Sequence, residues 1–199
     1  MFVKSAIVAA SMLFAVASNP AHAALITFED LSDGDVVTNQ YPGVVFSSVA
    51  GQANVITTQP GIGFGDDFLC TAAGGTGDNC TSETILTFTS LVNNLSFWQV
   101  GDNATGIVAL VDVFTNGVFA ATVNIFGFNN FNTPDLVDLS GFANVSAIRI
   151  HSITDPGGLG WDNFSFDDRN VPAVPLPGAF GLLAATLGGL GLLRRKSKA

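Results

Sequence analysis

The sequence predicts an all-β fold, and three features of residues 24–170 carry that prediction. Phe, Val, Ile and Thr recur in short runs, which Gly, Asn, Asp and Pro separate, as is typical of strands joined by turns. Leu95/Phe97 and Ile148/Ile150 alternate with polar residues at the two-residue period of a strand. No run of ten or more residues here has helical periodicity. About 147 residues with many short strands favour one domain, a β-sandwich of the jelly-roll kind.

Ten strands are expected in chain order. They are Leu25–Glu29, Gly43–Val49, Asn54–Thr57, Thr84–Thr89, Asn94–Val100, Gly106–Thr115, Val118–Phe126, Leu136–Leu139, Val145–Ser152 and Trp161–Asp167. The clearest local signal is Asn116-Gly117 between two apolar runs, which favours a type I′ hairpin because both residues tolerate positive φ.

Residues 1–23 have the composition of a signal peptide. Lys4 supplies the positive charge, Ala6–Ala17 is apolar, and Ala21-His22-Ala23 is a small-x-small cleavage site. The apolar segment is too short to be a preferred membrane span. We therefore expect an exported chain, preceded by a signal helix, whose mature form begins at Ala24.

The segment from 24 to 170 is strongly acidic. All sixteen Asp and Glu residues lie in it, against Arg149, Arg169 and no lysine, which gives a net charge of −14. Such a surface repels nucleic acid and anionic lipid, so we expect no nucleic-acid partner. It fits an extracellular setting where divalent cations screen the charge, and it fits equally a surface that is acidic for solubility alone.

The two cysteines, Cys70 and Cys80, are expected to form a disulfide, because an exported chain with an even pair favours one. Closing so short a loop contributes stability on the order of 2–3 kcal/mol. Their spacing fits no zinc pattern, and histidine is nearly absent.

Residues 171–199 form a tail in three parts. Three prolines between 172 and 177 oppose a helix that continues from the body. Residues 178–193 are uncharged, a helix of roughly 24 Å that spans a bilayer if flanking basic side chains snorkel and the bilayer thins. Four basic residues at 194–198 then form a cytoplasmic stop. These charges disfavour the alternative, a buried core helix.

This tail resembles the PEP-CTERM sorting signal of Gram-negative, exopolysaccharide-producing bacteria, in a Val-Pro-Leu-Pro variant. The matching residues are Val174, Pro175, Leu176 and Pro177, the apolar run 178–193, and Arg194, Arg195 and Lys196. The resemblance implies an inner-membrane intermediate held by a transmembrane helix and recognition by an exosortase-type membrane protease. It further implies cleavage near the proline motif or retention as an anchor, and delivery to the cell surface or extracellular matrix.

Both ends of the body resemble the β-sandwiches that often precede such tails. The matching segments are Ile26–Leu31, Val37–Tyr41, Gly43–Phe46 and Gly160–Phe166. Those sandwiches are similar to galactose-binding-like domains and carbohydrate-binding modules, and they often hold a structural Ca²⁺ where the first and last strands meet. The resemblance implies Glu29, Asp30 and Asp162 as its oxygen ligands. The alternative is that these acidic side chains bond loop amides at strand ends.

Glycan binding is a second candidate function. Sugar sites combine aromatic platforms with amide or carboxylate groups. Aromatic residues near predicted loops or strand ends, among Asn and Asp, are Tyr41, Phe64, Phe68, Trp98, Phe128, Phe131 and Trp161. We take Trp98, Tyr41 and Trp161 as the candidate contacts, with Trp98 expected to point outward because Phe97 points inward. With seventeen Phe residues in the chain, core packing accounts for most of the aromatics.

Catalysis has little support in the sequence. Adjacent strand residues point to opposite faces, so neither Asp66-Asp67 nor Asp167-Asp168 forms an acid/base couple by itself. His151 is the one histidine left after processing, and no Gly-x-Ser-x-Gly elbow accompanies it. The sequence thus predicts a non-catalytic surface or matrix protein that contacts exopolysaccharide. The alternatives are a hydrolase of extracellular polysaccharide and a purely structural surface protein.

Overall fold

The computed structural model describes residues 22–73 and 79–168, and every regular element in those residues is a β-strand. The strands are β1 His22–Ile26, β2 Val44–Ser48, β3 Gln52–Thr58, β4 Asp67–Ala73, β5 Thr84–Val100, β6 Thr105–Thr115, β7 Val118–Phe128, β8 Asp135–Asp138, β9 Val145–His151 and β10 Gly160–Asp168. The all-β prediction is confirmed. The signal helix, the transmembrane helix and the sorting motif fall outside the described residues.

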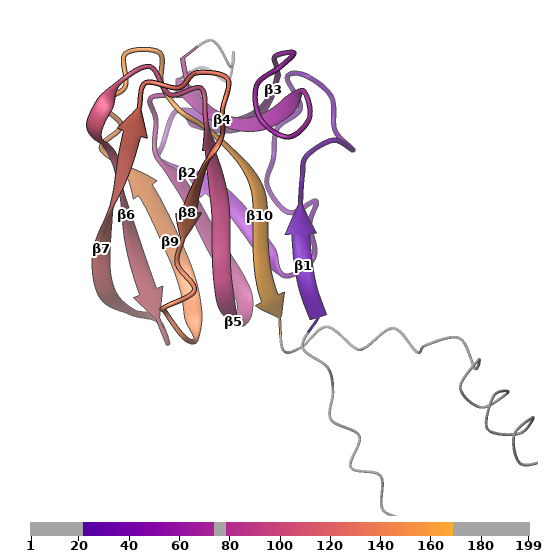
Figure 1. Cartoon of the computed structure of the whole chain (residues 1–199). Helices are drawn as coiled ribbons and strands as arrows, with labels where there is room; N and C mark the ends of the chain where they lie inside the picture. The colour runs from indigo at the N-terminus through magenta and orange to yellow at the C-terminus, as the bar shows by residue number, and fades with distance from the viewer. Residues whose placement is uncertain (1–21, 74–78, 169–199) are drawn as a thin grey trace, which may run out of the picture.

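The strands form two antiparallel layers that share β5 (Figure 1). The first layer has the order β2, β5, β9, β6, β7 and uses residues 84–92 of β5. The second has the order β3, β4, β10, β5, β8 and uses residues 92–100 of β5, with β1 beside the C-terminal half of β10. Among the described strands, β7 ends the first layer and β8 ends the second.

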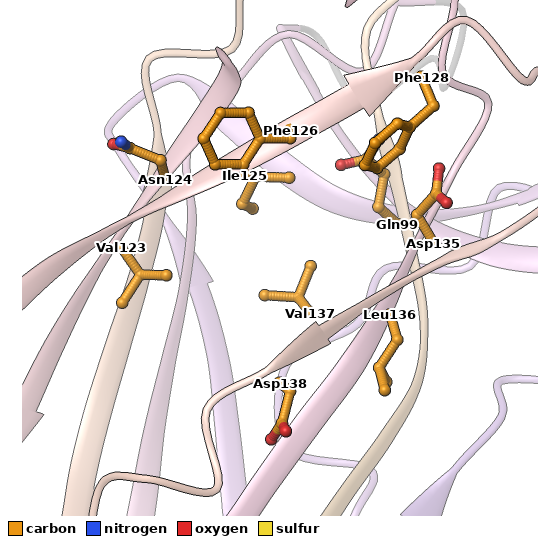
Figure 2. Close-up of a pocket in the computed structure, with 10 residues that line it drawn as sticks. All are labelled: Gln99, Val123, Asn124, Ile125, Phe126, Phe128, Asp135, Leu136, Val137 and Asp138. Atoms are coloured by element: carbon orange, nitrogen blue, oxygen red, sulfur yellow. The ribbon is translucent and has the colours of Figure 1, made fainter. Parts of the chain in front are cut away.

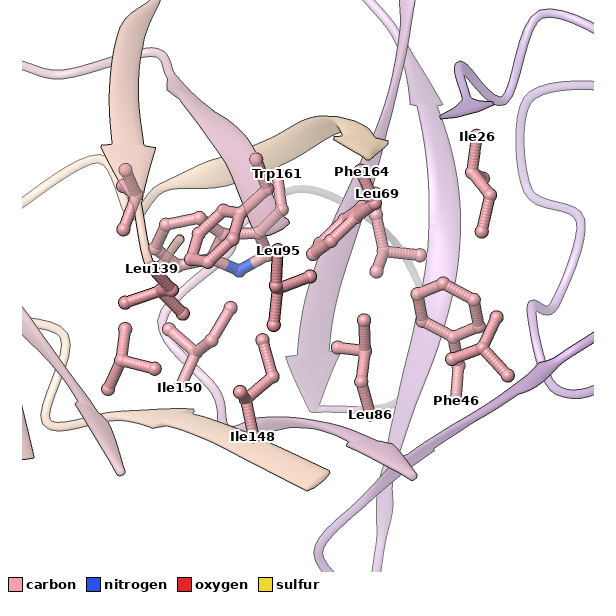
Figure 3. Close-up of a cluster of buried hydrophobic side chains, with 14 of the residues drawn as sticks. Ile26, Phe46, Leu69, Leu86, Leu95, Leu139, Ile148, Ile150, Trp161 and Phe164 are labelled. Carbon is pink, nitrogen blue, oxygen red and sulfur yellow. The ribbon is translucent and has the colours of Figure 1, made fainter. Parts of the chain in front are cut away.

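Side chains from both layers meet in one core (Figure 3). Leu86, Ile148 and Ile150 come from the first layer, and Leu95, Trp161 and Phe164 come from the second. Phe97 stacks on Phe164 with ring centroids 5.1 Å apart and meets Trp161 edge-on at 5.8 Å. These aromatic contacts add to the hydrophobic burial and hold β10 against β5.

β5 is one strand where the sequence predicts two, Thr84–Thr89 and Asn94–Val100. The chain bends between them: the register with β9 shifts between Thr87 and Val92, and Asn94 has a φ of 52°. Polar residues at the bend indicate a turn by composition. Instead the backbone stays hydrogen-bonded to neighbours in both layers as it crosses from one to the other, so the strand is continuous.

β4 is absent from the predicted strands. Glycine-rich segments flank it, and its Cys and Ala residues are weak strand formers. Seven register pairs with β3 define it, and Leu69 also pairs with Trp161 of β10. β4 carries Cys70, whose disulfide to Cys80 is confirmed, with the two Cα atoms 4.9 Å apart.

The Asn116-Gly117 hairpin is confirmed between β6 and β7. Thr115 pairs with Val118, and both turn residues have positive φ, 51° and 79°, as a type I′ turn requires. The turn starts the pairing of the two long strands, and two register shifts, between Val113 and Phe114 and between Ile107 and Ala109, then adjust it along β7.

β1 lies three residues earlier than predicted, so Glu29 follows the strand instead of ending it. The chain turns at Phe28, which has a φ of 62° and a fully buried ring that packs edge-on against Phe46 and Phe164. Cleavage at the predicted site would leave Ala24–Ile26 of β1 paired with β10. Within the residues that the structure places, no helix is long and apolar enough to cross a membrane.

Candidate functional site

A cleft of about 210 Å³ opens between β7 and β8, where the two layers part (Figure 2). Its walls come from β5, β7 and β8: Gln99, Val123, Asn124, Ile125, Phe126, Phe128, Asp135, Leu136, Val137 and Asp138. We call it the β7/β8 cleft. Because β7 and β8 each end a layer, no further strand among the described residues covers it.

Two polar side chains line the inner end of the β7/β8 cleft. Gln99 of β5 pairs with Asp135 of β8. The inward-facing pair Phe97 and Val137 lies two residues away along each strand, so Gln99 and Asp135 share its face of the sheet. Gln99 is only 1% exposed, and neither its Oε1 nor its Nε2 has a hydrogen-bond partner. The Oδ2 of Asp135 is likewise buried without a partner. Unpaired buried polar groups cost stability, which makes Gln99 and Asp135 candidates for contact with a ligand or with water.

A second carboxylate lies beside this pair. Asp102 is buried and accepts hydrogen bonds from the backbone N–H groups of Ala104, Phe128 and Asn129, which fixes the end of β7. Burial, and then the charge of Asp102, raise the pKa of Asp135. The inner end of the β7/β8 cleft is therefore a region of negative charge with low solvent exposure.

Gly127 is the residue that lets Asp102 approach. A Cβ at this position would lie 2.5 Å from Asp102 Oδ1 and 2.6 Å from both the Ala104 carbonyl oxygen and Val108 Cγ1. Two of these three atoms are backbone or tightly packed, so they cannot move aside cheaply. The carboxylate that charges the cleft depends on a glycine in β7.

The rim of the β7/β8 cleft is apolar. Phe126, Phe128 and Leu136 are 51%, 64% and 52% exposed, an unusual state for large hydrophobic side chains so close together. Figure 2 shows Phe128 at the same end of the cleft as Gln99 and Asp135. Both polar atoms of Gln99 and the Oδ2 of Asp135 are buried in this conformation, so a ligand that contacts them requires a side-chain rearrangement, a change that is common at binding sites.

The structure places the three predicted glycan contacts apart. Trp161 is fully buried in the core, so its ring is not available to a ligand. The half-buried Tyr41 donates a 2.6 Å hydrogen bond to Asp30 Oδ1, and burial followed by this bond raises its pKa. Trp98 points outward as expected and packs edge-on against Phe64, which is itself exposed, with centroids 4.6 Å apart.

Two of the three predicted calcium ligands meet at the loop between β3 and β4. Asp162 Oδ2 accepts from the Phe64 N–H at 3.3 Å, and Glu29 Oε1 accepts from the Asp67 N–H at 3.4 Å. Burial raises the pKa of Asp162 to about 6; hydrogen bonds from the Asn163 and Phe64 amides oppose the rise, and the charges of Glu29 and Asp67 add to it.

The third predicted ligand, Asp30, bonds Tyr41 instead. Over residues 22–73 and 79–168 no three His, Cys, Asp or Glu side chains lie close enough to hold a metal ion. Calcium binding at Glu29, Asp30 and Asp162 thus stays a prediction.

His151 has both a serine and a carboxylate as neighbours. Its Nδ1 lies 2.9 Å from Ser152 Oγ, and its Nε2 lies 3.2 Å from Asp112 Oδ2. Asp112 also accepts from Thr122. None of these residues lines the β7/β8 cleft. The group is a cross-strand polar network that ties β6, β7 and β9 together.

Comparisons with known proteins assign this chain to no family. No model of a protein family matches it, and no curated protein does. The CBM36-1 domain of a multidomain xylanase from the hindgut metagenome of Trinervitermes trinervoides is 16% identical over 75% of this chain and all of that domain, with a TM-score of 0.34.

Two further solved structures have similar scores. The isomalto-dextranase of Arthrobacter globiformis T6, in complex with panose, is 14% identical over 74% of this chain and 33% of the enzyme, with a TM-score of 0.37. An F5/8 type C domain from Bacteroides fragilis is 13% identical over 73% of this chain and 92% of that domain, with a TM-score of 0.32. Such low scores carry no argument. The class of this chain follows from its own strands, which form an all-β, two-layer antiparallel domain.

Gln99 and Asp135 were not among the residues predicted from the sequence, although part of the signal is there. Leu95 and Phe97 were assigned to the inward face, and continuing the same alternation by two residues puts Gln99 inward as well. A polar residue at an inward position is an anomaly that marks a site. The partner strand and its register were required to find Asp135.

Proposed function

We propose that this chain is an exported, non-catalytic protein of the cell surface or extracellular matrix that binds exopolysaccharide in the β7/β8 cleft. The observation that carries the proposal is the register pair Gln99 and Asp135, two side chains with buried, partnerless polar atoms in the wall of one cleft. We further propose that the sandwich is a jelly roll of the galactose-binding-like kind.

The composition of the cleft supports a sugar ligand. An amide offers one donor and one acceptor, and a carboxylate offers acceptors, which suits the paired hydroxyls of a pyranose ring. The exposed rings of Phe126 and Phe128 suit its apolar face. The volume of about 210 Å³ is below the roughly 300–1,000 Å³ of pockets that enclose drug-sized molecules. It is suited to one sugar unit of a longer chain that runs across the rim.

Binding of purified host exopolysaccharide to the full-length chain tests this function. Isothermal titration with the wild type should give saturable binding, and Asp135→Ala should weaken it at least tenfold, since a hydrogen bond to a charged group contributes about 1.5–3 kcal/mol. Asp33→Ala, an exposed carboxylate beside β3, serves as the control and should bind like the wild type. Equal binding by all three proteins would overturn the assignment of the cleft.

The second candidate function, a polysaccharide hydrolase, is favoured by one specific observation. The pKa of Asp135 is raised, whereas hydrogen bonds from Ser140 lower that of Asp138, and both side chains line the cleft. A general acid and a base need such a difference. Residues three apart on a strand point to opposite faces, however, and this arrangement disfavours a couple acting on one bond. Release of reducing sugar that disappears in both Asp135→Asn and Asp138→Asn would establish the hydrolase.

For the tail we propose delivery through a membrane intermediate and processing by an exosortase-type protease, as the Val174–Pro177 motif and the basic residues after the apolar run suggest. Intact-mass analysis of the surface protein tests this proposal. A mature form that ends near Pro177 is expected. A mature form that retains Lys198 would exclude cleavage at the motif.

A further inference from the structure

We propose that the β7/β8 cleft selects amino sugars, with the ammonium group of a hexosamine unit bound at Asp135. This inference rests on the proposed glycan-binding function and adds the chemical class of the sugar.

The first argument is charge. Asp135 lines the cleft, Asp102 is buried beside it, and none of the ten lining residues is Lys or Arg. Arg149 forms a bidentate ion pair with Glu83 on another part of the surface. The site therefore repels a uronate or a sulfated sugar and attracts a cation.

The second argument is that Asp102 has hydrogen-bond donors and the Oδ2 of Asp135 has none. Asp102 receives three backbone N–H groups, so its charge is fixed in place and has its acceptors occupied. Asp135 Oδ2 is in the field of that charge, buried, and without a donor. A sugar hydroxyl would supply the missing hydrogen bond but leave the repulsion. An ammonium group supplies the bond and offsets both charges, and a charge-assisted bond is roughly twice as strong as a neutral one.

The third argument is the amide opposite. Gln99 pairs with Asp135 across the ladder, so the two side chains lie near one another on the same face. Its free acceptor and donor fit the hydroxyl beside the amine on a 2-amino sugar. Recognition of an amine by the carboxylate and of its neighbouring hydroxyl by the amide orients the sugar ring in one way, with its face toward Phe128 at the same end of the cleft (Figure 2).

Three oligosaccharide series that differ only at carbon 2 of each unit test the inference. β-1,4-linked glucosamine, N-acetylglucosamine and glucose oligomers of equal length carry an ammonium, an acetamide and a hydroxyl group there. Titration calorimetry of the full-length chain at mildly acidic pH should give about tenfold tighter binding of the glucosamine oligomer than of the glucose oligomer. Asp135→Asn should abolish this preference. Asp33→Asn, which removes one charge from the surface beside β3, should preserve it.

Salt and pH give two independent readouts. The preference should weaken from low to high salt. It should also fall as pH drops through the raised pKa of Asp135, because the protonated carboxyl has no charge to attract an ammonium group. If Asp135→Asn does not fold, these two readouts on the wild type decide: a preference that is insensitive to both would overturn the inference.

The outcomes separate the inference from the proposed function. Equal affinity for glucose and glucosamine oligomers, or binding of polygalacturonate, would overturn amino-sugar selection while leaving glycan binding in place. Loss of the preference in Asp33→Asn as well as in Asp135→Asn would also overturn it, since attraction to the acidic surface would then explain the result. Failure to bind any oligomer or the host exopolysaccharide would overturn both.

Discussion

Replacing Gln99 by Leu should make the protein more stable and remove the exopolysaccharide binding that we propose for the β7/β8 cleft. The amide is 1% exposed and neither of its polar atoms has a partner. Burying an unpaired amide costs about 1–3 kcal/mol by mutational measurements. Leucine has a similar volume and no polar atoms, so Gln99→Leu recovers part of that cost. We expect a gain of about 1–2 kcal/mol, because the leucine does not fill the site as the amide does and recovers only part of the cost.

Thermal unfolding followed by circular dichroism measures the gain. For a domain of this size about 1 kcal/mol shifts the Tm by roughly 2–4 °C, so Gln99→Leu should melt about 3–6 °C higher than the wild type. Titration with the exopolysaccharide should show at least a tenfold loss of affinity. Stability and binding then change in opposite directions, as expected where a site retains unpaired polar groups for a ligand.

Gln40→Leu is the matched control. The Gln40 amide accepts from the Thr38 N–H and donates to the Val36 carbonyl, at 2.6 Å each, so the same substitution removes two bonds and should lower the Tm. A lower Tm for Gln99→Leu would refute the reasoning, because it would mean that the amide is paired in the folded protein. Unchanged affinity for exopolysaccharide would refute its role in binding.

Four further predictions follow from other sites. Asp162→Asn should raise stability at pH 7 by an amount on the order of 2 kcal/mol. Because the pKa of Asp162 is raised in the folded state, that state binds the extra proton, and wild-type stability falls as pH rises from about 4 to 6. A series of Tm values that lacks this slope in the wild type, or shows it in the variant too, would contradict the account. Ca²⁺ bound by Glu29 and Asp162 should raise the wild-type Tm at pH 7 by offsetting the repulsion between these two carboxylates, and the rise should vanish in Asp162→Asn. No change with Ca²⁺ or EDTA would rule the ion out. Gly127→Ala should destabilise the protein by about 1–3 kcal/mol in denaturant titration and weaken exopolysaccharide binding in calorimetry. If the variant has the stability and the affinity of the wild type, Asp102 is not held as described. Replacing Cys70 and Cys80 by serine should lower the unfolding free energy by about 2–3 kcal/mol in denaturant titration, and an unchanged midpoint would contradict this estimate.

The sequence predicts most strands because side-chain alternation and turn residues are local. The Asn116-Gly117 turn and the β6/β7 hairpin need only neighbouring residues, and both are confirmed. The pairing of Cys70 with Cys80 needs only their number and the export signal, and it is confirmed as well. β4 was missed because its strand character comes from pairing with β3 and β10 rather than from its own residues.

The candidate site depends on contacts that are distant in the sequence. Trp161 was predicted as a sugar contact because it is an aromatic residue near a strand end, among Asp and Asn, yet the core between the two layers encloses it completely. Phe128 is near the end of β7, and its exposure follows from that strand being the last of its layer. The meeting of Gln99 with Asp135 requires the register of β5 on β8, which no local pattern contains.

Hydrogen exchange measured by mass spectrometry tests the central claim most directly, because it locates the bound surface without any substitution. The full-length chain should be compared alone and with saturating host exopolysaccharide. Binding in the β7/β8 cleft predicts slower exchange in peptides that cover residues 123–129 and 135–138, with the β3 edge unchanged. Protection confined to other strands, or no protection at concentrations that saturate binding, would contradict the account.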